Sequence, residues 1–245
     1  LAAEFGQPAY RGRQLAAWIY QKSATTWEEM SDLPAAFRAK LQEKYSVLPI
    51  NVADHKRSSD EVDKLLVHRG DNQVFECVLL PYRDRVSCCL STQVGCPMAC
   101  TFCATGLGGF ARNLSVGEIV GQYLQLQSMS ARRIDHIVFM GMGEPLLNYD
   151  ALIAAIHIFH EEVGLSLRHM TVSTVGLVPQ IDRLAKEKLP IHLALSIHSP
   201  VDEVRSRLMP VNQRWPVRVV VDAMRRYQAT TGRKVTFEYL LIDGV

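Results

Sequence analysis

Three cysteines in one short segment constrain this chain more than any other feature of its sequence. Cys96, Cys100 and Cys103 follow the spacing C-x3-C-x2-C inside VSCCLSTQVGCPMACTFCATG, residues 86–106. Thiolates this close in sequence are typical of a metal site, because soft sulfur ligands select zinc or iron-sulfur clusters. Structural zinc and ordinary clusters take four protein ligands, and the cysteine loop, residues 96–103, supplies no fourth. Three ligands and one open position indicate a catalytic metal centre.

The neighbours of the cysteines favour one kind of centre. With Phe102 directly before the last cysteine, the loop resembles the signature of the radical S-adenosylmethionine (SAM) superfamily. That resemblance implies a [4Fe-4S] cluster on Cys96, Cys100 and Cys103, with its free iron chelating the amino and carboxylate groups of SAM. Reductive cleavage of SAM would then yield a 5'-deoxyadenosyl radical. The spacing alone leaves open a zinc knuckle or three core cysteines.

Six segments extend the resemblance over essentially the whole chain. In order they are SCCLSTQVGC, GFARNLSVGEIVGQ, GMGEPLLN, TVSTVGLVP, LALSIHSP and RVVVDAMRRY. They resemble the RlmN/Cfr family of radical SAM adenine methyltransferases, which implies two SAM molecules per turnover and 23S ribosomal RNA as a partner. We favour the RlmN branch, which methylates carbon 2 of adenine and also acts on tRNA. The alternatives are the sister activity at carbon 8, which confers ribosomal antibiotic resistance, and a non-catalytic cluster- or zinc-bearing RNA-binding module.

Composition is compatible with this function without requiring it. The 245 residues are 48% hydrophobic and 21% charged, as in an ordinary globular protein. No apolar run reaches the roughly 18 residues of a membrane span. Six cysteines, three of them in one loop, do not resemble a secreted disulfide framework. We expect a cytoplasmic monomer, and the resemblance adds an electron donor such as flavodoxin.

The ends of the chain suggest a fragment. The sequence starts without Met, as a processed or partial chain does. The family pattern continues past Val245 with a last strand, a cofactor-contacting Asn and the cysteine that carries the methyl group. We therefore expect residues 1–245 to bind and cleave SAM but not to methylate RNA.

Three regions are predicted along the chain. Residues 1–50 form a small helical domain, because Pro8 can begin a helix and apolar residues recur at helical spacing. The resemblance implies that this domain binds RNA, and its basic residues are Arg11, Arg13, Lys22, Arg38 and Lys40. Residues 51–84 hold a β-hairpin, with strands at 62–69 and 73–80 and a turn at Gly70, Asp71 and Asn72. Residues 85–245 form the radical SAM core.

The core alternates strands with helices. Strands are predicted at 86–91, 135–140, 169–173, 191–197 and 234–242, and helices at 115–129, 150–163, 178–188, 202–207 and 216–231. Repeated βα units indicate an α/β fold with a parallel sheet. Ser115 and Glu118 predict a capping box, and Asp150 is expected to cap the next helix. The resemblance makes the core a partial, TIM-like (β/α)6 barrel, incomplete at its C-terminus, with chemistry at the carboxyl ends of the strands.

Side-chain alternation separates the cysteines of the first core strand. Cys89 falls on one face with Ser87, and Cys88 falls on the other with Val86. We expect Cys88 in the core, Cys89 in the barrel lumen and Cys77 in a structural role. The resemblance matches Cys89 to the catalytic cysteine that resolves an RNA-enzyme link through a transient disulfide bond. It matches Glu76 to a proton acceptor near the target adenine. Without the resemblance, the alternatives are that Cys89 is a packed thiol and that Glu76 faces solvent.

The remaining site residues follow strands. GMGEP, residues 141–145, resembles the SAM-binding GGEP motif and implicates Gly143 and Glu144. Ser173, Ser196, Ile197 and His198 lie at the ends of the next two strands, where barrel ligands bind. Four pairs also stand out, Arg112 with Asn113, Arg132 with Arg133, Arg205 with Arg207 and Arg225 with Arg226. We expect most of these cations to be solvated and leave open that some contact phosphate.

Overall fold

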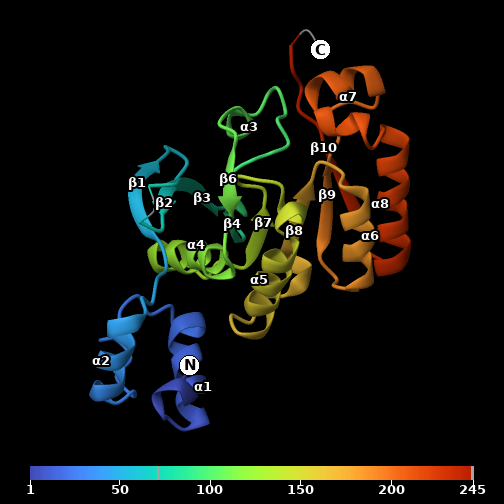
Figure 1. Cartoon of the computed structure of the whole chain (residues 1–245). Coiled ribbons are helices and arrows are strands. Elements are labelled where there is room, and N and C mark those ends of the chain that lie inside the picture. Colours follow the sequence, from blue (N-terminus) through green and yellow to red (C-terminus); the bar gives the residue numbers. More distant parts are fainter. Residues whose placement is uncertain (71, 244–245) are drawn as a thin grey trace.

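The computed structural model describes residues 1–70 and 72–243, and Figure 1 shows its two parts, a helical unit and a larger α/β body. Asp71, the middle of the expected hairpin turn, and Gly244 and Val245, the last residues of the expected core, lie outside the described residues. No helix in the described ranges is both long and apolar enough to span a membrane.

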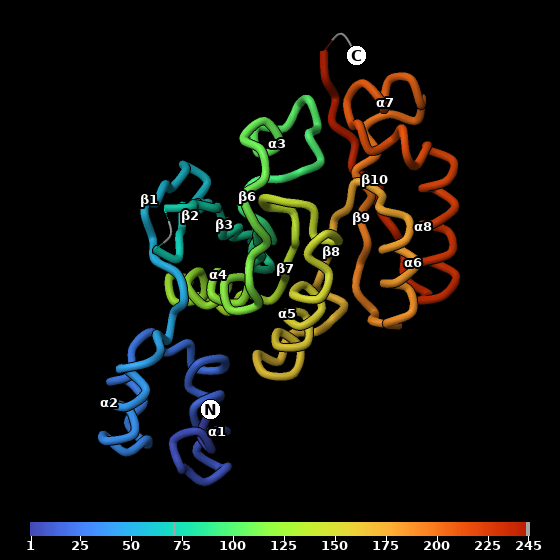
Figure 2. Tube along the Cα trace, viewed as in Figure 1, coloured from blue at the N-terminus to red at the C-terminus, as the bar shows by residue number. Residues whose placement is uncertain are grey.

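The helical unit has its own small core. It comprises η1 (Ala3–Phe5), α1 (Ala9–Ala16), η2 (Ala17–Gln21) and α2 (Ala35–Lys44). Trp27, Phe37 and Leu41 are buried among its own helices, in a cluster separate from the main core. Figure 2 shows the chain leaving α2 and running on into the first strand of the sheet. The predicted helical region is confirmed, with Pro8 directly before α1.

One sheet organises the α/β body. Among the described strands its order is β1-β2-β3-β4-β7-β8-β9-β10, with bounds Asn51–Arg57, Asp63–His68, Val74–Pro81, Val86–Cys89, His136–Phe139, Met170–Thr174, His192–Ser196 and Val235–Glu238. Pairing is antiparallel from β1 to β4 and parallel from β4 to β10. The predicted hairpin strands and the five parallel strands of a partial barrel are confirmed.

Helices cover one face of the parallel strands. They are α4 (Val116–Met129), α5 (Tyr149–Glu161), α6 (Val178–Lys186) and α8 (Val217–Thr231), while α7 (Asp202–Leu208) lies at the upper end of the sheet in Figure 1. Apolar residues of these helices, of which Ile119, Ile156 and Tyr227 are examples, pack with the inward face of the strands in the main core. Ser115 and Glu118 form the predicted capping box at the start of α4.

Three expectations about elements were wrong. Asp150 does not cap α5, because η3 (Pro145–Asn148) runs directly into the helix and Asn148 takes the capping position. Strand β10 ends at Glu238 rather than at residue 242. Strand β1 was not predicted, since all its residues are exposed and its sequence lacks the alternation that marks a half-buried strand.

Candidate active site

A small hairpin presents the cysteine loop. Strands β5 (Gln93–Gly95) and β6 (Phe110–Asn113) pair antiparallel and enclose the loop and helix α3 (Ala104–Leu107). The backbone N–H of Cys96 donates to the carbonyl of Gly109 at 2.8 Å, and that of Thr101 donates to the carbonyl of Leu208 at 2.9 Å. The loop is therefore held by its own hairpin and by the end of α7, at the upper end of the sheet in Figure 1.

The three predicted cysteines line one cavity of about 130 Å³, here called the cysteine cavity. Its lining also includes the predicted residues Gly143, Glu144, Ser196 and His198. Ser173 lines an adjoining strand-end cavity of about 240 Å³, which shares Gly143, Glu144 and Ser196 with the first. Ile197 packs against the main core instead. The structure thus brings most of the predicted metal and cofactor residues to one place.

The cysteine loop offers three soft sulfur ligands, which both zinc and iron-sulfur clusters select. Among the described residues, no three His, Cys, Asp or Glu side chains are placed to hold one metal ion. Burial raises the pKa of Cys96 and raises that of Cys100 to about 12. Both thiols are protonated without metal, and binding must release these protons.

The GMGEP turn is held by a buried glutamine. Gly143 has φ +98°, and a Cβ there would lie 2.5 Å from Cβ of Gln93. Gln93 accepts the backbone N–H of Glu144 at 2.9 Å and donates to Asn113 Oδ1 at 2.7 Å. Only glycine combines this backbone conformation with so close an approach. Sequence reasoning missed Gln93, because it follows the polar residues Ser91 and Thr92 and shows no hydrophobic period of its own.

Glu144 is 2% exposed, and its carboxylate is bound inside the protein. One oxygen accepts the N–H of Leu146 at 3.1 Å and the other accepts the N–H of Val175 at 2.9 Å. Burial raises the pKa of Glu144 to about 7, against the opposing effect of these hydrogen bonds. The carboxylate joins the turn to the end of β8, which leaves the turn's backbone as the part best placed to contact a ligand.

The ends of β8 and β9 supply neutral polar groups. The hydroxyls of Ser173 and Ser196 lie 3.4 Å apart. His198, at φ +53°, packs edge-on against Phe102 of the cysteine loop with ring centroids 4.8 Å apart. Its Nδ1 accepts the N–H of Leu240 at 3.1 Å, and burial lowers its pKa. The imidazole is therefore neutral at pH 7, and the proton on Nε2 is available as a donor.

Cys89 and Glu76 share the face of the sheet opposite the helices. Cys89 pairs with Val78 of β3, two positions from Glu76, so the two side chains point the same way. Cys88 is fully buried in the main core, as predicted from alternation. Burial raises the pKa of Cys89 to about 11, so its thiol is protonated at pH 7. Neither Cys89 nor Glu76 lines the cysteine cavity or the strand-end cavity as the described residues define them.

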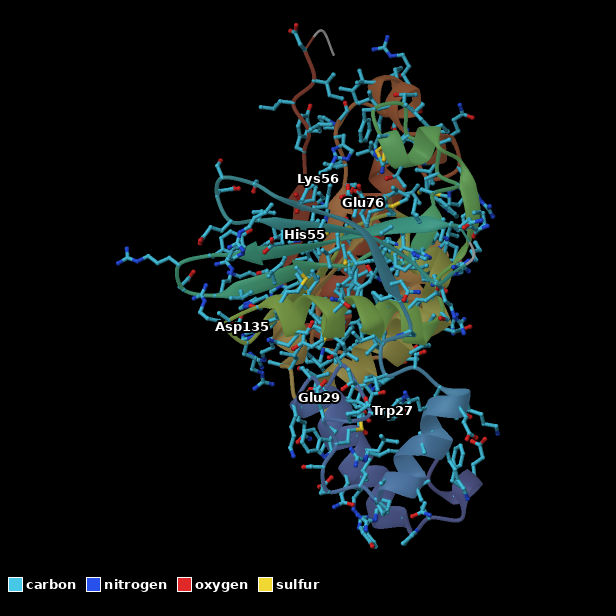
Figure 3. All side chains as sticks on the ribbon, turned by 90° about the vertical axis from the view of Figure 1, so that its left-hand side faces the viewer. Trp27, Glu29, His55, Lys56, Glu76 and Asp135 are labelled. Carbon is cyan, nitrogen blue, oxygen red and sulfur yellow. The ribbon has the colours of Figure 1, made fainter. Side chains whose placement is uncertain are left out.

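A lysine accompanies Glu76. Lys64 Nζ lies 2.9 Å from Glu76 Oε1, and both side chains are about half exposed. Lys56 pairs with Lys64 in the next strand and shares its face. Figure 3 shows Glu76 and Lys56 in the same part of the sheet, well away from Trp27 and Glu29 of the helical unit. Glu76 therefore lies on an open, basic extension of the sheet.

Most of the paired cations are exposed, as predicted: they are Arg132, Arg133, Arg207, Arg225 and Arg226. Several of the cations nevertheless make contacts within the protein. Arg112 binds the buried Glu118 at 2.8 Å. Arg132 donates to the carbonyls of Tyr82, Arg83 and Arg85, and Arg133 donates to those of Val163 and Gly164. Arg205 is fully buried. The periodicity of a short helix did not show this, because burial of Arg205 depends on loops that are distant in sequence.

The basic residues of the helical unit are partly engaged as well. Arg11 donates to the carbonyl of Asp32 at 2.6 Å, and Arg38 donates to that of Glu28 at 2.7 Å. Lys22 lies 3.6 Å from the centre of the Trp18 ring. A polar hollow of about 870 Å³ lies between this unit and the helices α4 and α5, and Lys22, Arg132 and Arg133 line it. It is remote from the cysteine loop and contains none of the predicted catalytic residues.

Comparison with known proteins agrees with this architecture. The family model described as Radical SAM superfamily matches residues 90–245, and the one described as Ribosomal RNA large subunit methyltransferase N-terminal domain matches residues 1–47. A "Probable dual-specificity RNA methyltransferase RlmN" of Moorella thermoacetica is 47% identical over 100% of this chain and 72% of its own length. A protein of the same name from a Synechococcus species is 45% identical over 98% of this chain and 68% of its own length.

A solved structure is similar throughout the chain. The crystal structure of a radical SAM methyltransferase from Sphaerobacter thermophilus superposes with a TM-score of 0.95 at 44% sequence identity. The match covers 100% of this chain and 73% of that one. Similarity of this extent includes the helical unit, the sheet and the hairpin that presents the cysteines.

Proposed function

This chain belongs to the RlmN family of radical SAM RNA methyltransferases, and from that membership we propose that the enzyme expressed from its whole gene methylates carbon 2 of one adenosine in 23S rRNA and of one adenosine in tRNA. The observation that best supports the proposal is the cysteine cavity, where three thiols meet the GMGEP turn and the ends of the parallel strands. An aromatic carbon of adenine is not a nucleophile, so simple displacement by a methyl donor cannot methylate it. Radical chemistry from a cofactor is required.

Three thiols and the adjoining turn would hold the cofactors. Cys96, Cys100 and Cys103 would ligate a [4Fe-4S] cluster, which supplies the electron that cleaves SAM when both are bound. The backbone of Gly143 and Glu144 would bind the amino group of SAM, because the Glu144 carboxylate is already bound to backbone N–H groups. The remaining contacts would come from Ser173, Ser196 and His198, whereas Ile197 packs against the main core and lines neither cavity.

Glu76 and Cys89 would act on the RNA. Both lie on the face of the sheet opposite the helices. In this proposal Glu76 accepts a proton near the target adenine, and the nearby Lys64 and Lys56 interact with RNA phosphate. Cys89 would break the covalent link between RNA and enzyme by attacking the sulfur of the methyl-carrying cysteine of the family pattern. A disulfide bond forms between the two sulfurs as the carbon–sulfur bond to the RNA breaks, and the methylene carbon takes up the proton that the Cys89 thiol gives up.

The partners follow from the reaction. One SAM donates the methyl group and a second provides the radical, so the enzyme needs a low-potential electron donor such as flavodoxin. The helical unit would contribute to RNA binding. Ribosomal and transfer RNA as substrates imply a cytoplasmic enzyme, and a monomer suffices because one chain contains all the site residues named above.

The proposal is tested in the source cells. We expect deletion of the gene that encodes this sequence to remove one methyl group from an adenine of 23S rRNA and from an adenine of tRNA, detected by mass spectrometry of digested RNA. A plasmid copy should restore both methyl groups, and a copy with Cys100→Ala should restore neither. Loss of 8-methyladenosine instead would assign the sister activity. Unchanged RNA would reject methyltransferase function.

A biochemical test addresses the metal site separately. Anaerobically reconstituted protein should contain iron and acid-labile sulfide in equal amounts, and addition of SAM should alter the EPR spectrum of the reduced cluster. Stoichiometric zinc without sulfide would support a structural zinc module and contradict the cluster.

A further inference from the structure

Arg205 of α7 is a fully buried cation without a carboxylate partner. Its side chain is 0% exposed. The guanidinium donates to four neutral oxygens, which are the carbonyls of Val175 at 2.7 Å, Ser196 at 3.2 Å and Ile197 at 3.1 Å and the amide oxygen of Asn212 at 2.7 Å. No acidic side chain in the described ranges forms an ion pair with it. Burying such a charge is costly unless another charge compensates it.

The cysteine loop lies against the same helix. Thr101 donates its N–H to the carbonyl of Leu208 at 2.9 Å, and Cys100 packs with Leu208 and Met209 at the end of α7. Val175 and Ser196, whose carbonyls bind the guanidinium, line the cysteine cavity. The buried cation is thus adjacent to one of the three proposed ligands.

Two carboxylates lie near the partners of Arg205. Glu144 is buried, but its oxygens accept the backbone N–H groups of Leu146 and Val175 and not the guanidinium. Asp202 is on the surface. Asn212 lies between Arg205 and Asp202, because its amide nitrogen donates to Asp202 Oδ1 at 2.9 Å. Asp202 is exposed, so solvent screens its charge. It offsets a fully buried guanidinium poorly, whereas charge that develops inside the cysteine cavity would be screened much less.

We propose that Arg205 is the buried counter-charge of the cysteine-bound cluster, an inference that rests on the proposed cluster at Cys96, Cys100 and Cys103. A cluster held by three thiolates carries net negative charge, which grows when it takes up one electron. Arg205 stabilises that charge and, through its hydrogen bonds to three carbonyls, also holds the ends of β8 and β9 in place. It acts through the cysteines and the strand ends, not by contact with substrate.

The test is the reduction potential of the cluster in anaerobically reconstituted protein. One electron per cluster is supplied by dithionite in a mediator-buffered titration followed by EPR. Arg205→Met should shift the midpoint potential to more negative values, because the reduced cluster loses its counter-charge. Arg205→Lys keeps the charge and should shift it less. Arg207→Met, two residues along the same helix but exposed, is the matched control and should leave the potential unchanged.

A second variant avoids removing the guanidinium. The exchange Asn212→Asp with Asp202→Asn leaves net charge unaltered and brings a carboxylate to the position of the amide oxygen now 2.7 Å from Arg205. It removes the hydrogen bond from the Asn212 amide to the carbonyl of Asp202. It should shift the potential in the same negative direction as Arg205→Met. If Arg205→Met fails to fold, this exchange decides the question.

The outcomes separate the inference from the proposed function. An unchanged potential in cluster-bearing Arg205→Met, or in the exchange variant, overturns the inference and leaves the function intact. Absence of iron and sulfide from the unaltered protein overturns both. A negative shift in either variant with an unchanged Arg207→Met supports the counter-charge.

Discussion

The hydroxyl of Ser91 donates to the backbone carbonyl of Glu76 at 2.5 Å. The same oxygen accepts the N–H of Met142, in the GMGEP turn, at 2.7 Å. The side-chain amide of Gln122 in α4 binds the backbone of Ser91 twice. It accepts the N–H of Ser91 at 2.8 Å and donates to the carbonyl of Ser91 at 3.0 Å. One buried hydroxyl therefore links the strand of the proposed proton acceptor to the turn proposed to bind SAM.

Replacing Ser91 with Ala should destabilise the protein and weaken SAM binding together. The variant leaves a carbonyl and an N–H unpaired in a buried position, which costs about 1–3 kcal/mol. Urea denaturation measures the loss of stability, and calorimetry of the reconstituted protein measures SAM affinity. Ser128→Ala, on the exposed side of α4, is the control and should change neither. Unaltered stability in Ser91→Ala would show that water replaces the hydroxyl.

Gly143→Ala should lower the free energy of unfolding by more than the backbone strain of a positive φ alone would. The new Cβ would collide with Gln93 at 2.5 Å, and φ is +98°. Gly232 also has positive φ, +67°, but nothing lies within 4 Å of the Cβ position. Gly232→Ala therefore measures the conformational cost, about 1–2 kcal/mol. Equal losses of stability in the two variants, measured by urea denaturation, would show that Gln93 moves aside freely.

Glu144 should make the cofactor-free protein less stable as pH rises. Burial raises its pKa from 4.5 to about 7, so the folded state binds the proton more tightly than the unfolded state. Its stabilising contribution is complete below about pH 4.5 and is lost as pH rises through about 7. The loss is on the order of 3 kcal/mol.

The comparison that checks this is urea denaturation at several pH values between 4.5 and 8. Glu144→Gln, which cannot ionise, should show a flatter pH profile than the unaltered protein. The exposed Glu162 supplies a control, since Glu162→Gln should keep the original profile. Parallel profiles for the unaltered protein and Glu144→Gln would mean that the carboxyl keeps an ordinary pKa.

Cys89→Ala in the enzyme expressed from its whole gene should retain cluster and SAM binding but stall after one turnover. The proposed covalent link would then lack the thiol that breaks it, so an RNA-enzyme adduct should accumulate and be seen as a shifted band on a denaturing gel. Cys77→Ala, in the core, should lose some stability and turn over normally. Multiple turnover by Cys89→Ala would assign Cys89 a packing role.

The local pattern of hydrophobic residues was sufficient to predict much of the fold. The core helices and strands were predictable because one face of each is buried, which leaves a period in the sequence. The opposite placement of Cys88 and Cys89 followed from alternation along β4. Strand β1 was not predictable, because exposure of both its faces removes that period. It is held to β2 by backbone pairing and by side-chain contacts such as that of His55 with Asp63, which leave no period in the sequence.

The sequence by itself determined that this chain has a three-thiolate loop and a parallel α/β core, because cysteine spacing and hydrophobic period are local properties. Only the tertiary structure decided which polar groups hold the site together. Gln93, Ser91 and Arg205 are buried by elements distant in sequence, and a buried polar side chain must bond whatever the fold brings to it. Their partners are mostly backbone atoms, which exist at every position and therefore leave no mark in the amino-acid sequence.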